Sequence, residues 1–267
     1  MEVSNLAKVK ITKINVADKK AEALADYVAQ EKPLHIFIHR KQYATIFCSP
    51  KQLKELVIGY LFSEGVIKDV NEIEKITVEK GNVCHVKFNP KVNFESRIKL
   101  AEHFSRIILS ACGGGPFASQ ALKKIKKIES NLKVDAETIH NCVNNLNYIA
   151  KTFRKTGGVH AAAIHKPNGK ILAFAEDVGR HNAVDKVIGK CLLKRVDFSQ
   201  CFLVSTGRLT SDVVSKAARA GIPIVASLTA TLDSSIGIAK KANMTLIGFV
   251  RGRRMNVYTA PERIKLE

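Results

Sequence analysis

The stretch that decides the fold reads Ile171-Leu-Ala-Phe-Ala175 followed by Glu176-Asp-Val-Gly-Arg-His-Asn-Ala-Val-Asp-Lys186. The apolar run predicts a buried strand, after which Gly179 turns the chain into a helix at 181–193. Acidic, basic and amide side chains thus gather at the carboxyl end of a strand, where open α/β sheets bind ligands. A solvated helix start with Asp177 as N-cap is the alternative, but capping needs one acidic residue rather than this whole cluster. We therefore favour a functional site here.

Strands and helices alternate on either side of this stretch. The expected strands are 159–165, 171–175, 201–205, 222–227, 244–250 and 255–259, and the expected helices are 181–193, 210–220 and 232–241. This succession predicts an α/β sheet layered with helices. A helix capped by Asp135 and running to about 153 precedes it.

The first third of the chain has a different pattern. Residues 7–16 and 34–48 alternate as strands, an amphipathic helix runs from Leu53 to Gly65, and Gly81-Asn82 predicts a hairpin. The fold class is therefore α/β (α+β overall). We expect a small N-terminal α+β domain at 1–105, a Gly-rich loop with a Lys-rich connecting helix to about 130 within 106–134, and an α/β domain at 135–267.

The net charge indicates which kinds of partner the protein could bind. The 267 residues include 43 Lys and Arg against 24 Asp and Glu, a formal net charge of +19. Such an excess predicts nucleic acid, an anionic membrane or a phosphate-rich ligand as partner, although lysines scattered over solvated helix faces would give the same count. Aromatic residues are 6% and Trp is absent, so the stacking platform of single-strand-binding proteins is missing. With no bilayer-length apolar run and no signal segment, we expect a soluble, cytoplasmic protein.

The six cysteines argue against a structural metal. They are Cys48, Cys84, Cys112, Cys142, Cys191 and Cys201, and no two form a C-x-x-C pair. This excludes a zinc ribbon and a thioredoxin-type motif, and His140 near Cys142 is a weak metal signal. All six fit a reducing compartment as thiols, four of them as small core residues in apolar runs.

Cys112 differs from the others because it lies in a Gly-rich loop, Ser110-Ala-Cys-Gly-Gly-Gly-Pro-Phe117. The glycines allow a ligand or partner to approach the backbone closely. Pro116 suits the first position of a following helix, whose positive end would favour a thiolate. A structural Gly-rich turn with an incidental cysteine explains the spacing equally well.

Further polar clusters follow other strands. Ser205-Thr-Gly-Arg208 resembles a phosphate or nucleobase cradle but is not a Walker A loop, and Ser227-Leu-Thr-Ala-Thr231 has the same small-hydroxyl character. The arginines of Phe249-Val-Arg-Gly-Arg-Arg254 suit phosphates and guanine edges, with a solvated basic turn as the alternative. With Thr156-Gly-Gly-Val-His160 before a strand, these clusters predict one cleft.

These motifs together resemble the FdhD family, the sulfurtransferase proteins required for formate dehydrogenase activity. The resemblance spans about residues 30–260 in order. It rests on 156–160, 176–186 and 205–208, on Leu246-Ile-Gly-Phe-Val-Arg-Gly252 with Asn256-Val-Tyr-Thr259, on Glu31-Lys-Pro-Leu34, and on Leu56-Val-Ile-Gly-Tyr-Leu-Phe-Ser-Glu-Gly65. It implies a C-terminal domain similar to the cytidine deaminase fold, without deaminase chemistry. The zinc signature of deaminases is absent, since Ala161 and Ala162 follow His160.

The resemblance also implies a function and partners. Such proteins take sulfur as a persulfide from a cysteine desulfurase and pass it to the molybdenum of the bis-molybdopterin guanine dinucleotide cofactor of formate dehydrogenase. Cys112 matches the first cysteine of the family's C-G-x-C-G loop, whereas Gly115 takes the place of the second. The implied cofactor-binding residues are Phe249, Val250, Arg251, Gly252, Arg253 and Arg254, with Asp177, His181, Ser205, Thr206, Gly207 and Arg208 as further contacts.

Several functions stay open at this point. The leading hypothesis is a sulfur carrier with Cys112 as the persulfide-bearing nucleophile, and the missing second cysteine favours a cofactor-delivery chaperone without sulfur chemistry. A guanine-nucleotide enzyme is a third possibility. Nucleic-acid binding ranks last, so we expect neither nucleic acid nor membrane as partner. The resemblance implies a homodimer.

Overall fold

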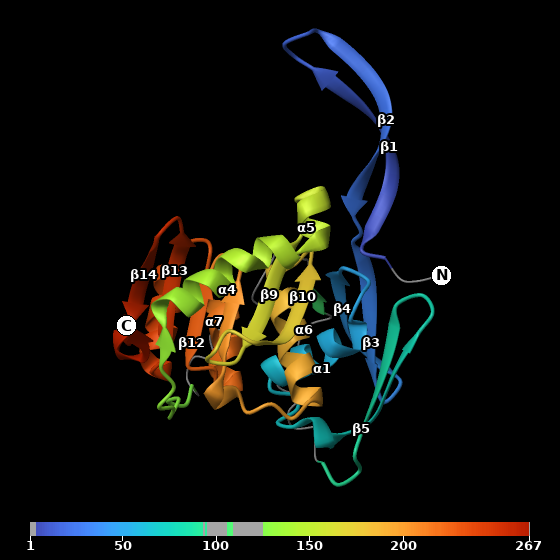
Figure 1. Cartoon of the computed structure of the whole chain (residues 1–267). Coiled ribbons are helices and arrows are strands. Elements are labelled where there is room, and N and C mark those ends of the chain that lie inside the picture. The colour runs from blue at the N-terminus through green and yellow to red at the C-terminus, as the bar shows by residue number, and fades with distance from the viewer. Residues whose placement is uncertain (1–3, 93, 95–105, 109–124, 267) are drawn as a thin grey trace.

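A computed structural model describes residues 4–92, 94, 106–108 and 125–266. Figure 1 shows a helix-covered sheet built from the C-terminal half, a smaller sheet from the N-terminal part beside it, and a long hairpin projecting from the body. This arrangement confirms the predicted mixed α/β class.

The C-terminal sheet has six strands in the order β10-β9-β11-β12-β13-β14. These strands are β9 (His160–His165), β10 (Ile171–Asp177), β11 (Phe202–Ser205), β12 (Ile224–Ser227), β13 (Thr245–Arg251) and β14 (Arg254–Thr259). β9 runs antiparallel to β10 and β11, β11 to β13 are parallel, and β14 is antiparallel to β13. The carboxyl ends of β10, β11, β12 and β13 therefore meet at one edge of the sheet.

Helices cover both faces of this sheet, and strand alternation divides the core between them. α6 (Arg180–Leu193), α7 (Ser211–Ala220) and α8 (Asp233–Ala242) pack on one face, against side chains such as Ala162, Leu203 and Val225. α4 (Ala136–Ile149) packs on the other, against Phe202 and Val204. β11 and β12 are buried along their whole length, as expected of parallel strands covered on both faces.

The N-terminal sheet has the order β5-β6-β3-β4-β7. Its strands are β3 (Lys32–Ile38), β4 (Lys41–Cys48), β5 (Ile73–Glu79), β6 (Val83–Phe88) and β7 (Arg106–Ile108), with η1 (Val70–Glu72) before β5. α1 (Leu53–Ser63) packs on it through Leu56, Val57 and Leu61. Gly81 and Asn82 both have positive φ and close the β5–β6 hairpin, as predicted.

Two glycines join the N- and C-terminal parts. α1 lies against α6, and Gly59 and Gly189 face the partner helix at the crossing. A Cβ on Gly59 would lie 1.9 Å from the Asp185 carbonyl oxygen, and one on Gly189 would lie 2.0 Å from that of Glu55. Only glycine therefore permits this approach, and the crossing fixes how the two sheets sit together.

The projecting hairpin pairs β1 (Leu6–Asn15) with β2 (Lys20–Ala29) and touches the body near its base, where β2 meets α5 (Lys151–Thr156). The sequence did not predict β2. Its alternation is weak because small alanines occupy positions 21, 23, 25 and 29.

The predicted Lys-rich helix is wrong where the structure describes it, because residues 125–133 are neither helix nor strand. Tertiary contacts override helix propensity here: Ile128 is buried and its N–H donates to the Ala242 carbonyl at the end of α8. The single helix expected from Asp135 to about 153 is interrupted at Ala150, which separates α4 from α5. The short elements β8 (Val134–Asp135), η3 (Phe198–Gln200), η4 (Pro261–Arg263) and β15 (Ile264–Lys265) were not predicted. None of the described helices is long and apolar enough to cross a bilayer.

Candidate functional site

The predicted strand-end clusters meet at the carboxyl edge of the six-stranded sheet. Hydrogen bonds link the loops from one strand to the next: the Ser227 hydroxyl donates to the Gly207 carbonyl at 2.7 Å, and Phe249 N–H donates to the Thr229 carbonyl at 3.0 Å. Thr206 N–H reaches the Ala161 carbonyl at the start of β9. The 156–160, 205–208, 227–231 and 249–254 segments thus line one edge, which we call the carboxyl-edge site.

The acidic groups of 176–186 serve mainly to hold the structure together. The Asp177 side chain is fully buried and forms an ion pair with Lys186 at 2.6 Å. Its two oxygens also accept hydrogen bonds from the N–H groups of Ser49 and Gly179 and from the Asn182 amide. With four donors on two oxygens, the Asp177 carboxylate positions the strand end and fastens the N-terminal part to it.

Two further carboxylates of this segment also form structural hydrogen bonds and ion pairs. Glu176 accepts hydrogen bonds from Thr152 N–H and Phe153 N–H in the first turn of α5. Asp185 pairs with Lys216 of α7 at 2.7 Å and accepts the Ser63 hydroxyl of α1 at 2.7 Å. The density of ionisable residues therefore reflects a buried network that joins α1, α6 and α7. Lys216, Ser49 and Ser63 were missed at the sequence level, where nothing connects them with residues more than a hundred positions away or with another helix.

Within 176–186, His181 offers unused hydrogen-bonding atoms. It is buried, and neither ring nitrogen has a partner among the described residues. Burial and the positive charges of Lys216 and Arg180 lower the pKa of His181 to about 3. Its imidazole is therefore neutral near pH 7 and has one donor and one acceptor available.

His160 lies in the same part of the edge. Burial and the charges of Arg180 and Arg208 lower its pKa, so it too is biased toward the neutral form. A Cβ on Gly207 would lie 3.4 Å from His160 Nδ1 and 2.8 Å from the Arg180 Cβ, which places these side chains around the glycine. The buried hydroxyls of Thr210 and Thr231 also have no partner among the residues that the structure describes.

In the 205–208 turn, two side chains stabilise the turn and one is exposed to solvent. The Ser205 hydroxyl accepts Gly207 N–H at 3.1 Å, and the Thr206 hydroxyl accepts Ala161 N–H at 2.9 Å, so both shape the turn. Arg208 is exposed and lies just before α7. It is the side chain of this turn best placed to reach a ligand.

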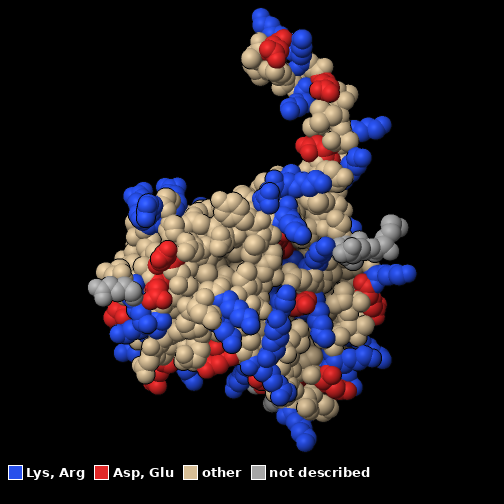
Figure 2. Space-filling model, viewed as in Figure 1, with Lys and Arg blue, Asp and Glu red and all other residues tan. Residues whose placement is uncertain are grey.

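The 249–254 segment forms the tip of the β13–β14 hairpin. Val250 is buried in the core, whereas Arg251, Gly252, Arg253 and Arg254 are exposed. The Arg251 guanidinium lies over the Phe249 ring at 5.1 Å, and the Gly252 carbonyl contacts His140 of α4. Figure 2 shows basic side chains gathered over this hairpin tip. Three flexible arginines on an anchored turn can bind phosphates through bidentate hydrogen bonds.

Five of the six cysteines lie among the described residues, and Cys112 does not. Cys48, Cys84, Cys142, Cys191 and Cys201 are buried and free. Burial raises the pKa of Cys48, Cys84 and Cys191 to about 12 and that of Cys142 and Cys201 to about 11. These five are therefore inert thiols near pH 7. Cys112 lies outside the described residues. The described part of the chain has no cluster of three or more His, Cys, Asp and Glu that could hold a metal ion.

Comparisons with known proteins agree with these motifs. The model of the FdhD/NarQ family matches residues 29–265. A "Sulfur carrier protein FdhD" from Saccharolobus solfataricus is 39% identical over 257 residues, 94% of this chain and 96% of the relative. One from Bacillus subtilis is 36% identical over 90% of this chain and 91% of the relative. The crystal structure of a candidate formate dehydrogenase accessory protein from Desulfotalea psychrophila aligns with a TM-score of 0.80 and 28% identity, covering 98% of this chain and all of that one.

Proposed function

The chain belongs to the FdhD/NarQ family, and from this premise we propose that it is a sulfur carrier that uses Cys112 as its persulfide-bearing nucleophile. The observation that carries the proposal is the state of the other thiols. A thiolate is needed to accept sulfur, and the five described cysteines are buried with raised pKa values. Cys112, in its Gly-rich sequence, is the remaining candidate.

The loading step is an exchange between sulfur atoms. The Cys112 thiolate attacks the terminal sulfur of a persulfide on a cysteine desulfurase, a new S–S bond forms, and the donor cysteine leaves as a thiolate. No net oxidation occurs in this step. In the delivery step the sulfane sulfur becomes a sulfido ligand of molybdenum by taking two electrons, which a reduced, tetravalent metal centre can supply, and Cys112 returns to the thiolate.

The client cofactor suits the carboxyl-edge site. The bis-molybdopterin guanine dinucleotide carries two pyrophosphates and two guanines, and the exposed arginines at 208, 251, 253 and 254 match phosphates in charge and geometry. The ring nitrogens of His181 and the hydroxyls of Thr210 and Thr231, which have no partner among the described residues, offer neutral hydrogen-bonding groups at the same edge of the sheet. These observations support a site for an anionic, nucleotide-containing client.

A delivery chaperone without sulfur chemistry is the second candidate, because Gly115 stands where the family loop has its second cysteine. Maturation of formate dehydrogenase in a strain that lacks this protein separates the two. A sulfur carrier requires that Cys112→Ser lose activity, while Cys142→Ser, a matched change in an inert thiol, retains it. Full activity of Cys112→Ser would favour the chaperone.

Binding of GDP tests the carboxyl-edge site independently of the sulfur chemistry. The double variant Arg251→Ala and Arg254→Ala should bind GDP at least about tenfold more weakly than wild type, since hydrogen bonds to charged groups are each worth that much. Lys240→Ala, an exposed change on α8, is the control and should leave GDP affinity unaltered. Equal affinities in all three proteins would remove this site from the proposal.

We also propose formate dehydrogenase as the recipient enzyme and a homodimer as the assembly. Light scattering of the purified chain measures the second directly, and a monomer at micromolar concentration would refute it.

A further inference from the structure

We propose that a pocket between α1, α7 and the segment at 125–126 binds a phosphate monoester of a small, partly apolar molecule, separately from the carboxyl-edge site. The pocket has a volume of about 350 Å³, at the lower end of the range of ligand sites. Phe62, Gly65, Ile67, Lys68, Ile125, Lys126, Ser215, Ala218 and Arg219 line it.

The pocket is distinct from the carboxyl-edge site by its place in the fold. Arg208 and Thr210 stand at the beginning of α7, whereas Arg219 is in its last turn. A helix of ten residues is about 15 Å long. A ligand of a few hundred Å³ at the far end of α7 therefore does not reach the arginines of the carboxyl-edge site.

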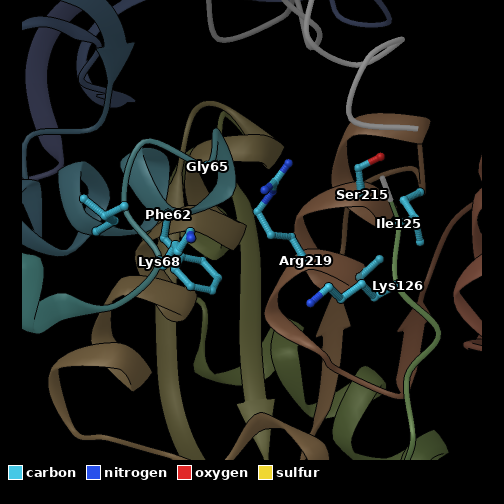
Figure 3. Close-up of a pocket in the computed structure, with 9 residues that line it drawn as sticks. Phe62, Gly65, Lys68, Ile125, Lys126, Ser215 and Arg219 are labelled. Atoms are coloured by element: carbon cyan, nitrogen blue, oxygen red, sulfur yellow. The ribbon is translucent and has the colours of Figure 1, made fainter. Parts of the chain in front are cut away.

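Three cations from three separate segments line the pocket. Lys68 follows α1, Lys126 belongs to the irregular segment before α4, and Arg219 comes from α7. Figure 3 shows Lys68 beside Phe62 on one side, Lys126 on the other, and Arg219 between them. Among the described residues, no ion pair forms with any of the three. The Glu72 carboxylate accepts the backbone N–H of Lys68 rather than pairing with its ammonium group.

The Arg219 guanidinium lies close to the backbone of Gly65. Gly65 has a φ of +76°, and a Cβ there would lie 2.8 Å from Arg219 Nη1, so the guanidinium lies directly over the glycine backbone. The Ser215 hydroxyl, one turn earlier on α7, has no partner among the described residues. A guanidinium fork, two ammonium groups and a free hydroxyl form a donor set suited to a phosphate dianion.

The remaining lining residues are apolar, which predicts that the ligand carries an apolar group beside its phosphate. Ile67 and Ala218 are buried, and Phe62 and Ile125 are half-buried. Inorganic phosphate alone would leave this apolar wall in contact with water. An aromatic or similarly flat group bearing one phosphate would cover the wall and place its charge among the cations.

Phenyl phosphate is the probe, titrated calorimetrically into the full chain at low ionic strength with inorganic phosphate and phenol as comparisons. We expect saturable binding of phenyl phosphate, tighter than that of either comparison. Arg219→Ala should weaken it at least about tenfold, and Lys126→Ala and Ser215→Ala should weaken it by smaller factors. Because Arg219 and Lys126 are exposed, the Arg219→Ala and Lys126→Ala variants should keep the wild-type melting temperature.

Two controls locate the binding. Lys240→Ala removes an exposed charge of α8, and Arg251→Ala removes one from the carboxyl-edge site; neither should change phenyl phosphate affinity. Conversely, Arg219→Ala should leave GDP affinity unchanged. The inference about this pocket can therefore be refuted while the proposed role of the carboxyl-edge site is supported. The inference is overturned by absence of saturable binding in the wild type, by an Arg219→Ala variant that binds normally, or by equal losses in Lys240→Ala or Arg251→Ala.

Discussion

Gly189→Ala should separate the two helices that join the N- and C-terminal parts of the molecule. An alanine Cβ there would lie 2.0 Å from the Glu55 carbonyl oxygen and 2.8 Å from Gly59 N, where ordinary contact begins at 3.4 Å. The difference between 3.4 and 2.0 Å requires the helices to open by about 1.4 Å. Gaps of 0.5–1 Å already forfeit about a quarter to a half of the dispersion energy between the atoms concerned.

The magnitude follows from two opposing effects. Overpacking a core costs about 1–3 kcal/mol, and the upper end applies because the clash is with the backbone of α1 rather than with a flexible side chain. Replacing a helical glycine by alanine returns about 1 kcal/mol of helix propensity. The free energy of unfolding should therefore fall by about 2 kcal/mol, which lowers the melting temperature by about 4–8 °C in a chain of this size.

Thermal and guanidinium unfolding followed by circular dichroism measure this effect. Gly237→Ala is the matched control, since a Cβ at that position of α8 meets nothing within 4 Å. It should stabilise the protein by about 0.5–1 kcal/mol. If Gly189→Ala proved as stable as wild type or as Gly237→Ala, the close α1–α6 crossing would be wrong.

Three further predictions concern buried charge, pH and temperature. Asp177→Asn should cost about 3–5 kcal/mol, because it leaves Lys186 buried without its counter-charge; a loss below about 1 kcal/mol by urea unfolding would contradict the buried pair. Burial lowers the pKa of His165 to about 4, and burial with nearby cations lowers that of His181 to about 3. The unfolded chain therefore binds protons first as pH falls below about 6.5, and the free energy of unfolding should drop by about 2 kcal/mol per histidine between pH 8 and pH 5. His165→Gln should reduce this pH dependence by about half, because His181 still contributes, and a flat wild-type profile would contradict the lowered pKa values of the two histidines. Ser63→Ala, which removes a donor to the buried Asp185 carboxylate, should lower the melting temperature, and an unchanged value would contradict that role.

The local patterns of the C-terminal sheet were predictable because they depend on neighbours in the sequence. The apolar runs at 202–205 and 224–227 read as strands, and the polar residues after them lie at the predicted edge. By contrast, the role of Asp177 depends on Ser49, which is 128 positions away, and that of Asp185 depends on Lys216 in another helix. Periodicity contains no information about such contacts.

Other departures from the predictions also depend on contacts between residues that are far apart in the sequence. The segment at 125–130 has the composition of a helix, but Ile128 is buried and its N–H donates to the Ala242 carbonyl, and the segment is neither helix nor strand. Sequence singled out the arginines of 249–254 because they are dense and flanked by glycine, and all three are exposed at the hairpin tip. It could not show that Val250, directly before them, is buried in the core.

The central claim, that sulfur is carried on Cys112, is tested most directly by mapping sulfane sulfur. The chain is incubated with a cysteine desulfurase and cysteine, alkylated, digested and examined by peptide mass. The account predicts an added sulfur atom on the peptide that contains Cys112, and on none containing Cys48, Cys84, Cys142, Cys191 or Cys201. Sulfur on one of those five peptides, or equal loading of a Cys112→Ala variant, would contradict it.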